Sequence, residues 1–235
     1  MVTSKSRSIQ KPPAARAFIS YSHEDRKYGA QAKAVFVEVG IDAFLAHEDL
    51  DVSDEWRARI IEELNSCSIF VPLLSANFVA SKWAPQEVGF IISRPSVAIA
   101  PVSLDGTMPF GFMSHVQGRR ISKEGITREL LVEPLARRIP RQILPGLIKL
   151  ASRAGTFRSA EALMAPLVEH FGNMTPDEAQ TLAEASVKND QIWAAQLCRD
   201  QYLPDFLSLQ GKNIDRKTLR ALKYQLENHT WYKGE

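Results

Sequence analysis

The sequence predicts an α/β domain with a parallel sheet covered by helices on both faces, followed by a smaller all-α region. From residue 16 to residue 139, short apolar stretches alternate with longer amphipathic ones, which is typical of strands connected by helices. From residue 140 to residue 235 we find no convincing strand pattern, and amphipathic stretches follow one another. We therefore expect three parts: a disordered leader at 1–15, an α/β domain at 16–139 and a helical domain at 140–235.

The strands of the α/β domain are predicted from five short apolar stretches. The third, 68–74, is almost wholly apolar, as expected for a central strand that is covered on both faces. The last is short and begins with two arginines, which favours an edge strand. The five predicted strands are 17–21, 41–45, 68–74, 97–104 and 119–121.

Helices are predicted between these strands at 24–39, 54–64, 85–92 and 126–138. Gly40 follows the first of them at the position where glycine commonly ends a helix. Pro85 is expected at the first position of the third helix, where a backbone N–H would have no partner within the helix in any case. Residues 75–83 are expected to be irregular or weakly helical, and 47–53 and 105–118 to be loops.

The C-terminal part is predicted to contain helices at 142–153, 159–171, 176–187, 191–203 and 216–228. Thr175 and Glu178 form the pattern of a capping box, with a proline at the first helical position. Asn189 is the expected cap of the next helix, and Pro204 is expected to interrupt the one after it. We expect a role in protein interaction, sensing or oligomerisation.

Composition excludes several classes of protein. The 29 Lys+Arg nearly balance the 27 Asp+Glu, and a net charge of +2 gives no electrostatic argument for binding nucleic acid or a membrane. The longest apolar runs fall far short of a membrane span. Cys67 and Cys198 lie far apart, which indicates a reducing, cytoplasmic setting. The basic leader lacks the apolar segment of a secretory signal, although a transit peptide has a similar composition.

Polar residues follow the predicted strands at the edge where open parallel sheets bind their ligands. Neither GxGxxG nor GxxxxGK[ST] occurs, so NAD-dependent oxidoreductases and P-loop NTPases are excluded. No cluster of His, Cys and Asp has the spacing of metal ligands, and we expect no metal and no cofactor. The candidate site residues at this edge are Ser20, Tyr21, Ser22, Phe44, His47, Asp49, Ser81, Trp83 and Glu87.

Two motifs resemble those of the TIR (Toll/interleukin-1 receptor) family. Residues 18–25 (FISYSHED) are similar to the opening strand and turn of that family. Residues 75–78 (SANF), followed by 81–87 (SKWAPQE), are similar to its Ser-x-Trp-x-x-x-Glu segment. The resemblance covers about residues 16–139 and implies a flavodoxin-like, five-stranded parallel sheet with helices on both faces.

The resemblance to bacterial TIR enzymes implies cleavage of NAD+ at the bond between nicotinamide and ribose, with Glu87 as the catalytic residue. A carboxylate stabilises the oxocarbenium-like ribose that remains. In the first turn of its helix, Glu87 would be favoured in its ionised form, which argues against a role as proton donor. The product is ADP-ribose or a cyclic form of it, and NAD+ is a substrate rather than a cofactor. The setting implied is antiviral defence.

Each candidate residue also has a structural interpretation. Glu87 can simply complement the helix dipole. Ser20, Tyr21 and Ser22 line a pocket or only end a strand. Trp83 packs in the core or forms a pocket wall, and Phe44 is a core residue or a ring that stacks on nicotinamide. In the family, the loop that contains His47 and Asp49 gates the pocket and contacts other TIR domains, but the same residues suit a solvated acidic loop.

Other functions remain open at this point. A non-enzymatic adaptor or a virulence effector would act through contacts between TIR domains, and a nucleoside deoxyribosyltransferase uses a related sheet and a glutamate. Ala84 stands where some family members carry a cysteine, and Pro85 lies inside the motif. Expected partners are NAD+, further copies of the TIR domain, and a downstream effector or an activator that arises during infection.

Overall fold

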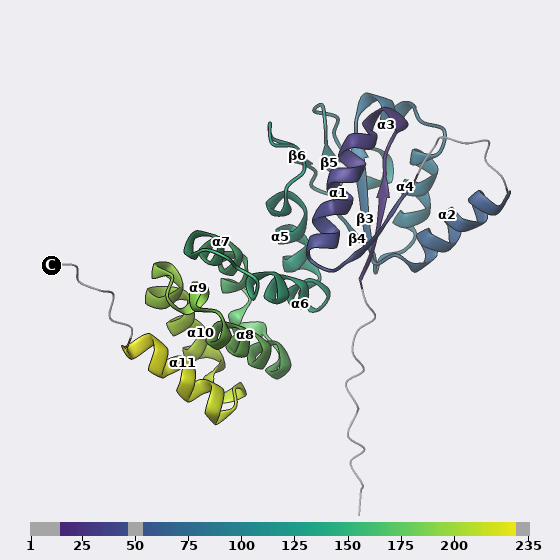
Figure 1. The fold of residues 1–235 in the computed structure, drawn as a ribbon. Coiled ribbons are helices and arrows are strands. Elements are labelled where there is room, and N and C mark those ends of the chain that lie inside the picture. The colour runs from purple at the N-terminus through teal and green to yellow at the C-terminus, as the bar shows by residue number, and fades with distance from the viewer. Residues whose placement is uncertain (1–14, 47–53, 229–235) are drawn as a thin grey trace, which may run out of the picture.

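The computed structural model describes residues 15–46 and 54–228 (Figure 1). Its parallel sheet has the order β2-β1-β3-β5-β6, with β4 also paired to β3. This order, in which the chain runs from β1 to one side and returns to the other, is the flavodoxin-like order that we expected. The strands are β1 (Arg16–Ser20), β2 (Asp42–Leu45), β3 (Ile69–Leu74), β4 (Ala98–Ile99), β5 (Val102–Ser103) and β6 (Arg119–Arg120).

The fourth predicted strand, 97–104, is split into β4 and β5. Both pieces keep the same register against β3, since Ile69 pairs with Ala98 and Leu73 with Val102. This register sets Pro72 opposite Pro101. Pro72 has no N–H to donate to the neighbouring strand, so the ladder of hydrogen bonds breaks at this point while the strand continues in the same direction. The backbone of Pro101 faces β6 instead, since its carbonyl accepts the N–H of Arg119.

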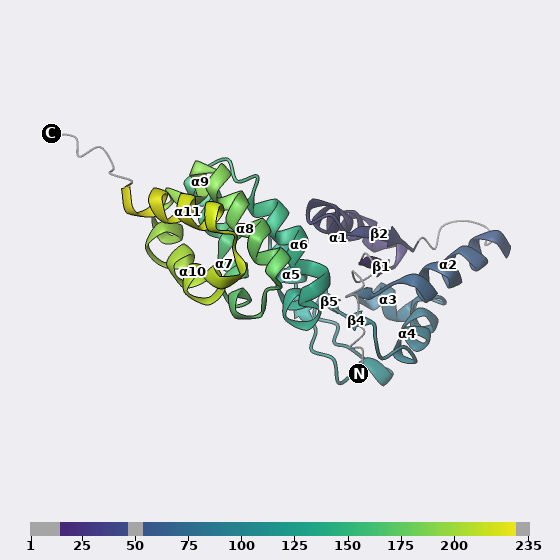
Figure 2. The same cartoon turned by 90° about the horizontal axis from the view of Figure 1, so that it is seen from below.

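Helices cover both faces of the sheet (Figures 1 and 2). Ile19 and Val71 belong to a core shared with α1 (Arg26–Glu38) and α5 (Arg128–Arg138). Phe18 and Phe70 point to the other face, because side chains alternate along a strand. They join a second core, which contains residues of the three remaining helices of this part: α2 (Asp54–Ser66), α3 (Ala76–Ala80) and α4 (Ala84–Ile92).

The first predicted helix, 24–39, is divided in the structure. A short 3-10 turn, η1 (His23–Asp25), precedes α1, and Gly40 follows the helix with a φ of 74°, as expected for a glycine that ends a helix. Residues 75–83, expected to be weakly helical, contain α3. The loop predicted at 105–118 contains a single 3-10 turn, η2 (Gly111–Met113).

The C-terminal region is helical throughout its described part. Thr175 and Glu178 form the predicted capping box. The expectation of one helix at 191–203 is wrong: Pro204 lies in the first turn of α10, where proline is tolerated, so it helps to start a helix. The elements are α6 (Pro140–Ala151), α7 (Phe157–Val168), η3 (Phe171–Asn173), α8 (Pro176–Lys188), α9 (Asp190–Trp193), the π-helical turn η4 (Cys198–Tyr202), α10 (Leu203–Gln210), η5 (Gly211–Asn213) and α11 (Arg216–Asn228).

The α/β and helical parts meet without a linker. Ile139 ends α5 and also precedes the first residue of α6. One continuous apolar core runs from the sheet face under α1 and α5 into the helical region. The division into domains at 139/140 stays a prediction. In both views α2 and α11 lie at opposite ends of the molecule (Figures 1 and 2). Within the described residues no helix combines the length and the apolar character required to cross a bilayer.

Candidate functional site

The structure brings Glu87 together with Ser20 at the carboxyl end of β1. The Ser20 hydroxyl donates a hydrogen bond of 2.5 Å to Oε2 of Glu87. Both side chains are buried, with 0% of Ser20 and 6% of Glu87 exposed. A hydrogen bond this short is typical of a hydroxyl that donates to an ionised carboxylate.

Local sequence explains why these two side chains meet. Ser20 is two residues after Phe18, so it points to the face of the sheet that α4 covers. Glu87 lies in the first turn of α4, in which Pro85 is the second residue. The Ser81 hydroxyl oxygen accepts hydrogen bonds of 3.1 Å from the N–H groups of Trp83 and Ala84, so it fixes the start of the helix. The positive end of the helix therefore stabilises the Glu87 carboxylate.

A second buried carboxylate lies at the same edge of the sheet. The Ser75 hydroxyl, directly after β3, donates a hydrogen bond of 2.5 Å to Oδ2 of Asp25, directly before α1. The same oxygen of Ser75 accepts the Phe78 N–H and so caps α3. Burial raises the pKa of Asp25 above its usual value, although the bond from Ser75 opposes this effect. The pair ties the turn after β1 to the segment after β3, across the point where the strand order reverses.

Asp105 ties a third segment to this edge. Its carboxylate follows β5 and accepts a hydrogen bond of 2.9 Å from the N–H of Ala76, the first residue of α3. Its other oxygen accepts bonds from the hydroxyl and the N–H of Thr107. The Thr107 hydroxyl, followed by these N–H groups, lowers the pKa of Asp105 to about 2. Two carboxylates therefore fix the start of α3: Asp105 binds the N–H of Ala76, and Asp25 binds the hydroxyl of the capping residue Ser75.

The remaining predicted residues near Glu87 fall into two groups. Tyr21 and Ser22 are buried and follow Ser20 directly. The Tyr21 ring lies against Gly29 of α1, where a Cβ atom would come within 3.1 Å of it. Ser22 donates a hydrogen bond to the carboxylate of Glu24. Ser81 and Trp83 are half-buried at the start of α4, on the segment that carries Glu87.

Phe44 lies in an aromatic cluster on the face of the sheet that carries Ser20. Its ring centroid is 5.4 Å from that of Phe18 and 5.9 Å from that of Trp56. These contacts favour the core interpretation of the half-buried Phe44 ring. His47 and Asp49 lie outside the described residues, so their predicted part in the site stays a prediction.

Asp25 and Asp105 were not among the site residues predicted from the sequence. Asp25 was part of the family motif at 18–25, and its position directly after the first strand was the available signal. Asp105 follows the fourth predicted strand and could have been placed at the same edge, because polar residues directly after parallel strands gather there. Their hydrogen-bond partners are 50 and 29 residues away in sequence, which no local pattern reveals.

The arrangement as a whole offers buried carboxylates and hydroxyl groups at the carboxyl edge of a parallel sheet. Such an arrangement can stabilise a cation and accept hydrogen bonds from sugar hydroxyls. Across the described ranges, no three His, Cys, Asp or Glu side chains lie close enough to hold a metal ion. In this structure the Glu87 side chain itself is buried.

Comparison with known proteins identifies the family of the α/β part. A family model described as a TIR domain matches residues 17–131, which contain Ser20, Asp25, Glu87 and Asp105. A search of curated proteins finds no match. Residues 17–131 of this chain are therefore a TIR domain.

Proposed function

We propose that this TIR domain cleaves the bond between nicotinamide and ribose in NAD+, with Glu87 as the catalytic carboxylate. The observation that carries the proposal is the buried Glu87 carboxylate, which accepts the Ser20 hydroxyl at the carboxyl edge of β1. Burying a charged group is costly, and buried acids at such edges are frequently functional.

The proposed reaction needs one carboxylate and no acid. The bond between C1′ of ribose and the pyridinium nitrogen breaks, and its electron pair stays with nitrogen, so nicotinamide leaves as a neutral base. Glu87 stabilises the positive charge that develops on the ribose. Water then adds to C1′ and releases a proton, which gives ADP-ribose. If a nucleophile within the ADP-ribose moiety reacts first, the product is cyclic.

Ser20 and the start of α4 hold the carboxylate ready for this role. The Ser20 hydroxyl and the positive helix end both favour the ionised form of Glu87. Because Glu87 is 6% exposed, the structure corresponds to a closed state in this proposal. We therefore expect activity to depend on a step that uncovers Glu87, such as assembly or the binding of an activator.

The test is incubation of the purified full chain with NAD+, with and without a crowding agent that favours assembly, followed by mass spectrometry of the products. We expect free nicotinamide together with ADP-ribose or its cyclic isomer, and we expect both to be lost in Glu87→Gln. Glu129→Gln is the matched control, since Glu129 is exposed on α5. Release that is unchanged in Glu87→Gln would reject the assignment. Exchange of bases between free nucleosides would instead indicate a deoxyribosyltransferase.

An adaptor function is the second candidate, and a specific surface favours it. Met108 and Phe112 in the loop after β5 are 70% and 80% exposed, and large exposed apolar side chains commonly lie in protein contacts. TIR domains self-associate, and this loop is suited to such a contact. Phe112→Glu is expected to lower the self-association of the chain in light scattering. If Glu87→Gln keeps association while NAD+ is never cleaved in either protein, the adaptor function is the better account.

A role in antiviral defence follows from the resemblance to bacterial TIR enzymes. In this proposal, infection switches the activity on, and the cell then loses NAD+ or receives a cyclic nucleotide signal. The test is expression of the chain and of Glu87→Gln in bacteria that are then infected with a panel of phages. Protection and a fall in cellular NAD+ that both require Glu87 would support the role. NAD+ levels and plaque counts that match in the two strains across the panel would contradict it.

A further inference from the structure

The exposed face of α11 carries an uneven distribution of charge. Arg216, Lys217, Arg220 and Lys223 are all exposed, and Glu227 is the only acidic residue of this helix. Within the described ranges none of the four cations forms a salt bridge. From the net charge of +2 for the whole chain we expected no nucleic acid partner. A net charge does not reveal that positive charges are concentrated on one helix.

Three of these cations lie in a row along the helix. Arg216, Arg220 and Lys223 are spaced four and three residues apart, which places them on one side of α11 within about 10 Å of axial length. The apolar side of α11, about a quarter-turn from the row, is already used, because Leu222 is fully buried and Leu219 and Leu226 pack against the core. With its apolar side occupied, the helix cannot insert that side into a membrane surface. A partner of this face is therefore recognised by charge.

An aromatic ring lies beside the row of cations. Tyr224 is 66% exposed, next to Lys223 and one turn after Arg220. An exposed ring among cations is the combination with which proteins bind single-stranded nucleic acid, because phosphates bind the cations and bases stack on the ring. An acidic protein surface would bind the cations as well, but it has no bases to stack on the Tyr224 ring.

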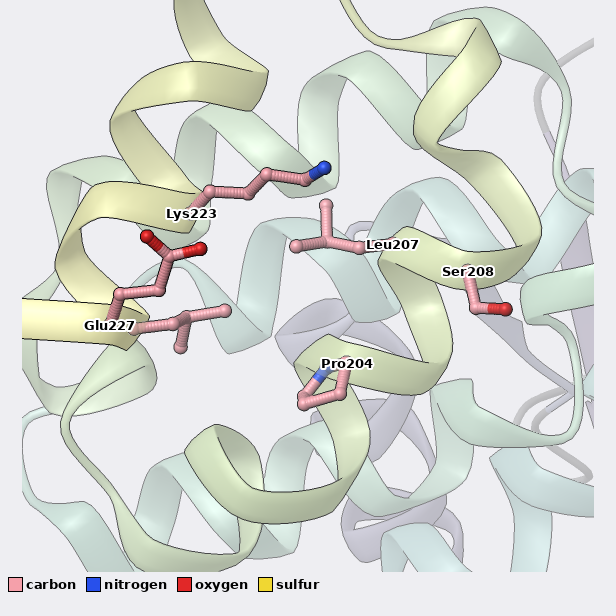
Figure 3. A pocket seen from close by; sticks show the side chains of 6 residues that line it. Pro204, Leu207, Ser208, Lys223 and Glu227 are labelled. Atoms are coloured by element: carbon pink, nitrogen blue, oxygen red, sulfur yellow. The ribbon is translucent and has the colours of Figure 1, made fainter.

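A hollow of about 360 Å³ opens beside Lys223, between α10 and α11 (Figure 3). Pro204, Leu207 and Leu226 supply its apolar lining, and Ser208, Lys223 and Glu227 supply its polar groups. Lys223 extends from α11 toward Leu207 of α10 (Figure 3). A nucleobase is flat and apolar on its faces and polar at its edge, which matches this lining. A carboxylate such as Glu227 accepts hydrogen bonds from the amino groups of bases.

We propose that α11 and the adjacent hollow bind a single-stranded polynucleotide. Its phosphates contact Arg216, Arg220 and Lys223, one base stacks on Tyr224, and a neighbouring base enters the hollow. RNA and DNA share this chemistry. The surface lies in the helical region, at the end of the molecule opposite α2 (Figures 1 and 2), so it is separate from the TIR site.

The test is fluorescence anisotropy of the full chain with labelled 20-nucleotide strands of uridine and of thymidine, a DNA duplex and polyglutamate. We expect micromolar binding of the single strands in 50 mM salt, with a linear fall in log affinity as log salt rises. The variant Arg216→Gln/Arg220→Gln/Lys223→Gln should bind at least tenfold more weakly and show a salt slope smaller by about 2, since about 0.7 is lost per phosphate contact. The matched control, Lys33→Gln/Lys149→Gln/Arg153→Gln, removes three exposed cations from α1, α6 and the turn after α6.

Two further variants separate this proposal from simple attraction between charges. Tyr224→Ala is expected to lower the affinity for the single strands about tenfold through lost stacking. Ser208→Trp fills the hollow without a change in charge and is also expected to weaken binding. The proposal is overturned if no strand binds at 100 μM protein, if the two triple variants weaken binding equally, or if polyglutamate binds as tightly as the strands. Unchanged affinity in Tyr224→Ala and Ser208→Trp would likewise overturn it.

Discussion

The backbone of Gly146 in α6 lies against the carbonyl group of Val39, at the end of α1. A Cβ atom at position 146 would overlap the carbonyl oxygen of Val39. The absence of a side chain therefore allows the first helix of the C-terminal region to pack directly on a helix of the TIR domain.

Gly146→Ala is expected to lower the free energy of unfolding, because the new methyl group must displace backbone rather than a movable side chain. Overpacking of this kind commonly costs about 1–3 kcal/mol. Urea unfolding followed by circular dichroism measures the change. Gly89→Ala is the matched control inside a helix: its Cβ meets nothing within 4 Å, and alanine favours a helix by about 0.5–1 kcal/mol. If Gly146→Ala were as stable as Gly89→Ala, the close contact would be contradicted.

Ser20→Ala is expected to destabilise the fold by about 1–3 kcal/mol, because the buried Glu87 carboxylate loses a donor. In a Glu87→Ala background the same change should cost less, since no carboxylate remains to be satisfied. A double-mutant cycle from urea unfolding gives this coupling. Ser186→Ala is a control, as that buried hydroxyl donates only to the neutral carbonyl of Leu182. Equal costs of Ser20→Ala in both backgrounds would show that the two side chains are not coupled.

Asp105 is expected to contribute to stability in a way that depends on pH. Its pKa is about 2 in the folded chain, against 3.8 for an unperturbed aspartate, because Thr107 and backbone N–H groups bind its ionised form. Its contribution is therefore present above pH 3.8 and is lost as the pH falls toward 2. Asp105→Asn should be less stable than the parent chain at pH 7, with a difference that shrinks below pH 4. A difference that stays constant from pH 7 to pH 2 would contradict this assignment.

Both cysteines are expected to be inert in the folded chain. Cys67 and Cys198 are buried, and burial raises the pKa of the Cys198 thiol to about 12. Compared with an unperturbed thiol of pKa 9.0, its thiolate fraction at neutral pH falls on the order of 1,000-fold. Titration with a thiol reagent should detect two thiols quickly in urea and almost none in buffer. Rapid reaction of either thiol in buffer would contradict this prediction, because it would show that the thiol is accessible to solvent in the folded chain.

The layout of the TIR domain could be predicted from the sequence because it depends on local patterns. The apolar run of β3, the glycine after α1 and the proline at the start of α4 are each readable within a few residues. The break between β4 and β5 could not be read this way, since it depends on Pro72 of the neighbouring strand β3, which has no N–H to donate. The start of α10 was mispredicted because Pro204 was taken as an interruption of a helix.

The candidate site was predictable in part. Glu87 and Ser20 were placed at one edge of the sheet by the strand pattern and by the family motifs, and the structure joins them with a hydrogen bond. The contacts of Asp25 with Ser75, and of Asp105 with the start of α3, depend on packing between distant segments. The burial of Glu87 likewise follows from tertiary packing and from no local signal.

The most direct test of the catalytic role of Glu87 is the initial rate of nicotinamide release from NAD+ under activating conditions, compared between the parent chain, Ser20→Ala and Glu87→Gln. The account predicts a graded result: full rate in the parent chain, a rate lowered roughly tenfold in Ser20→Ala through loss of one bond to the carboxylate, and no release above background in Glu87→Gln. Equal rates in all three proteins would contradict it.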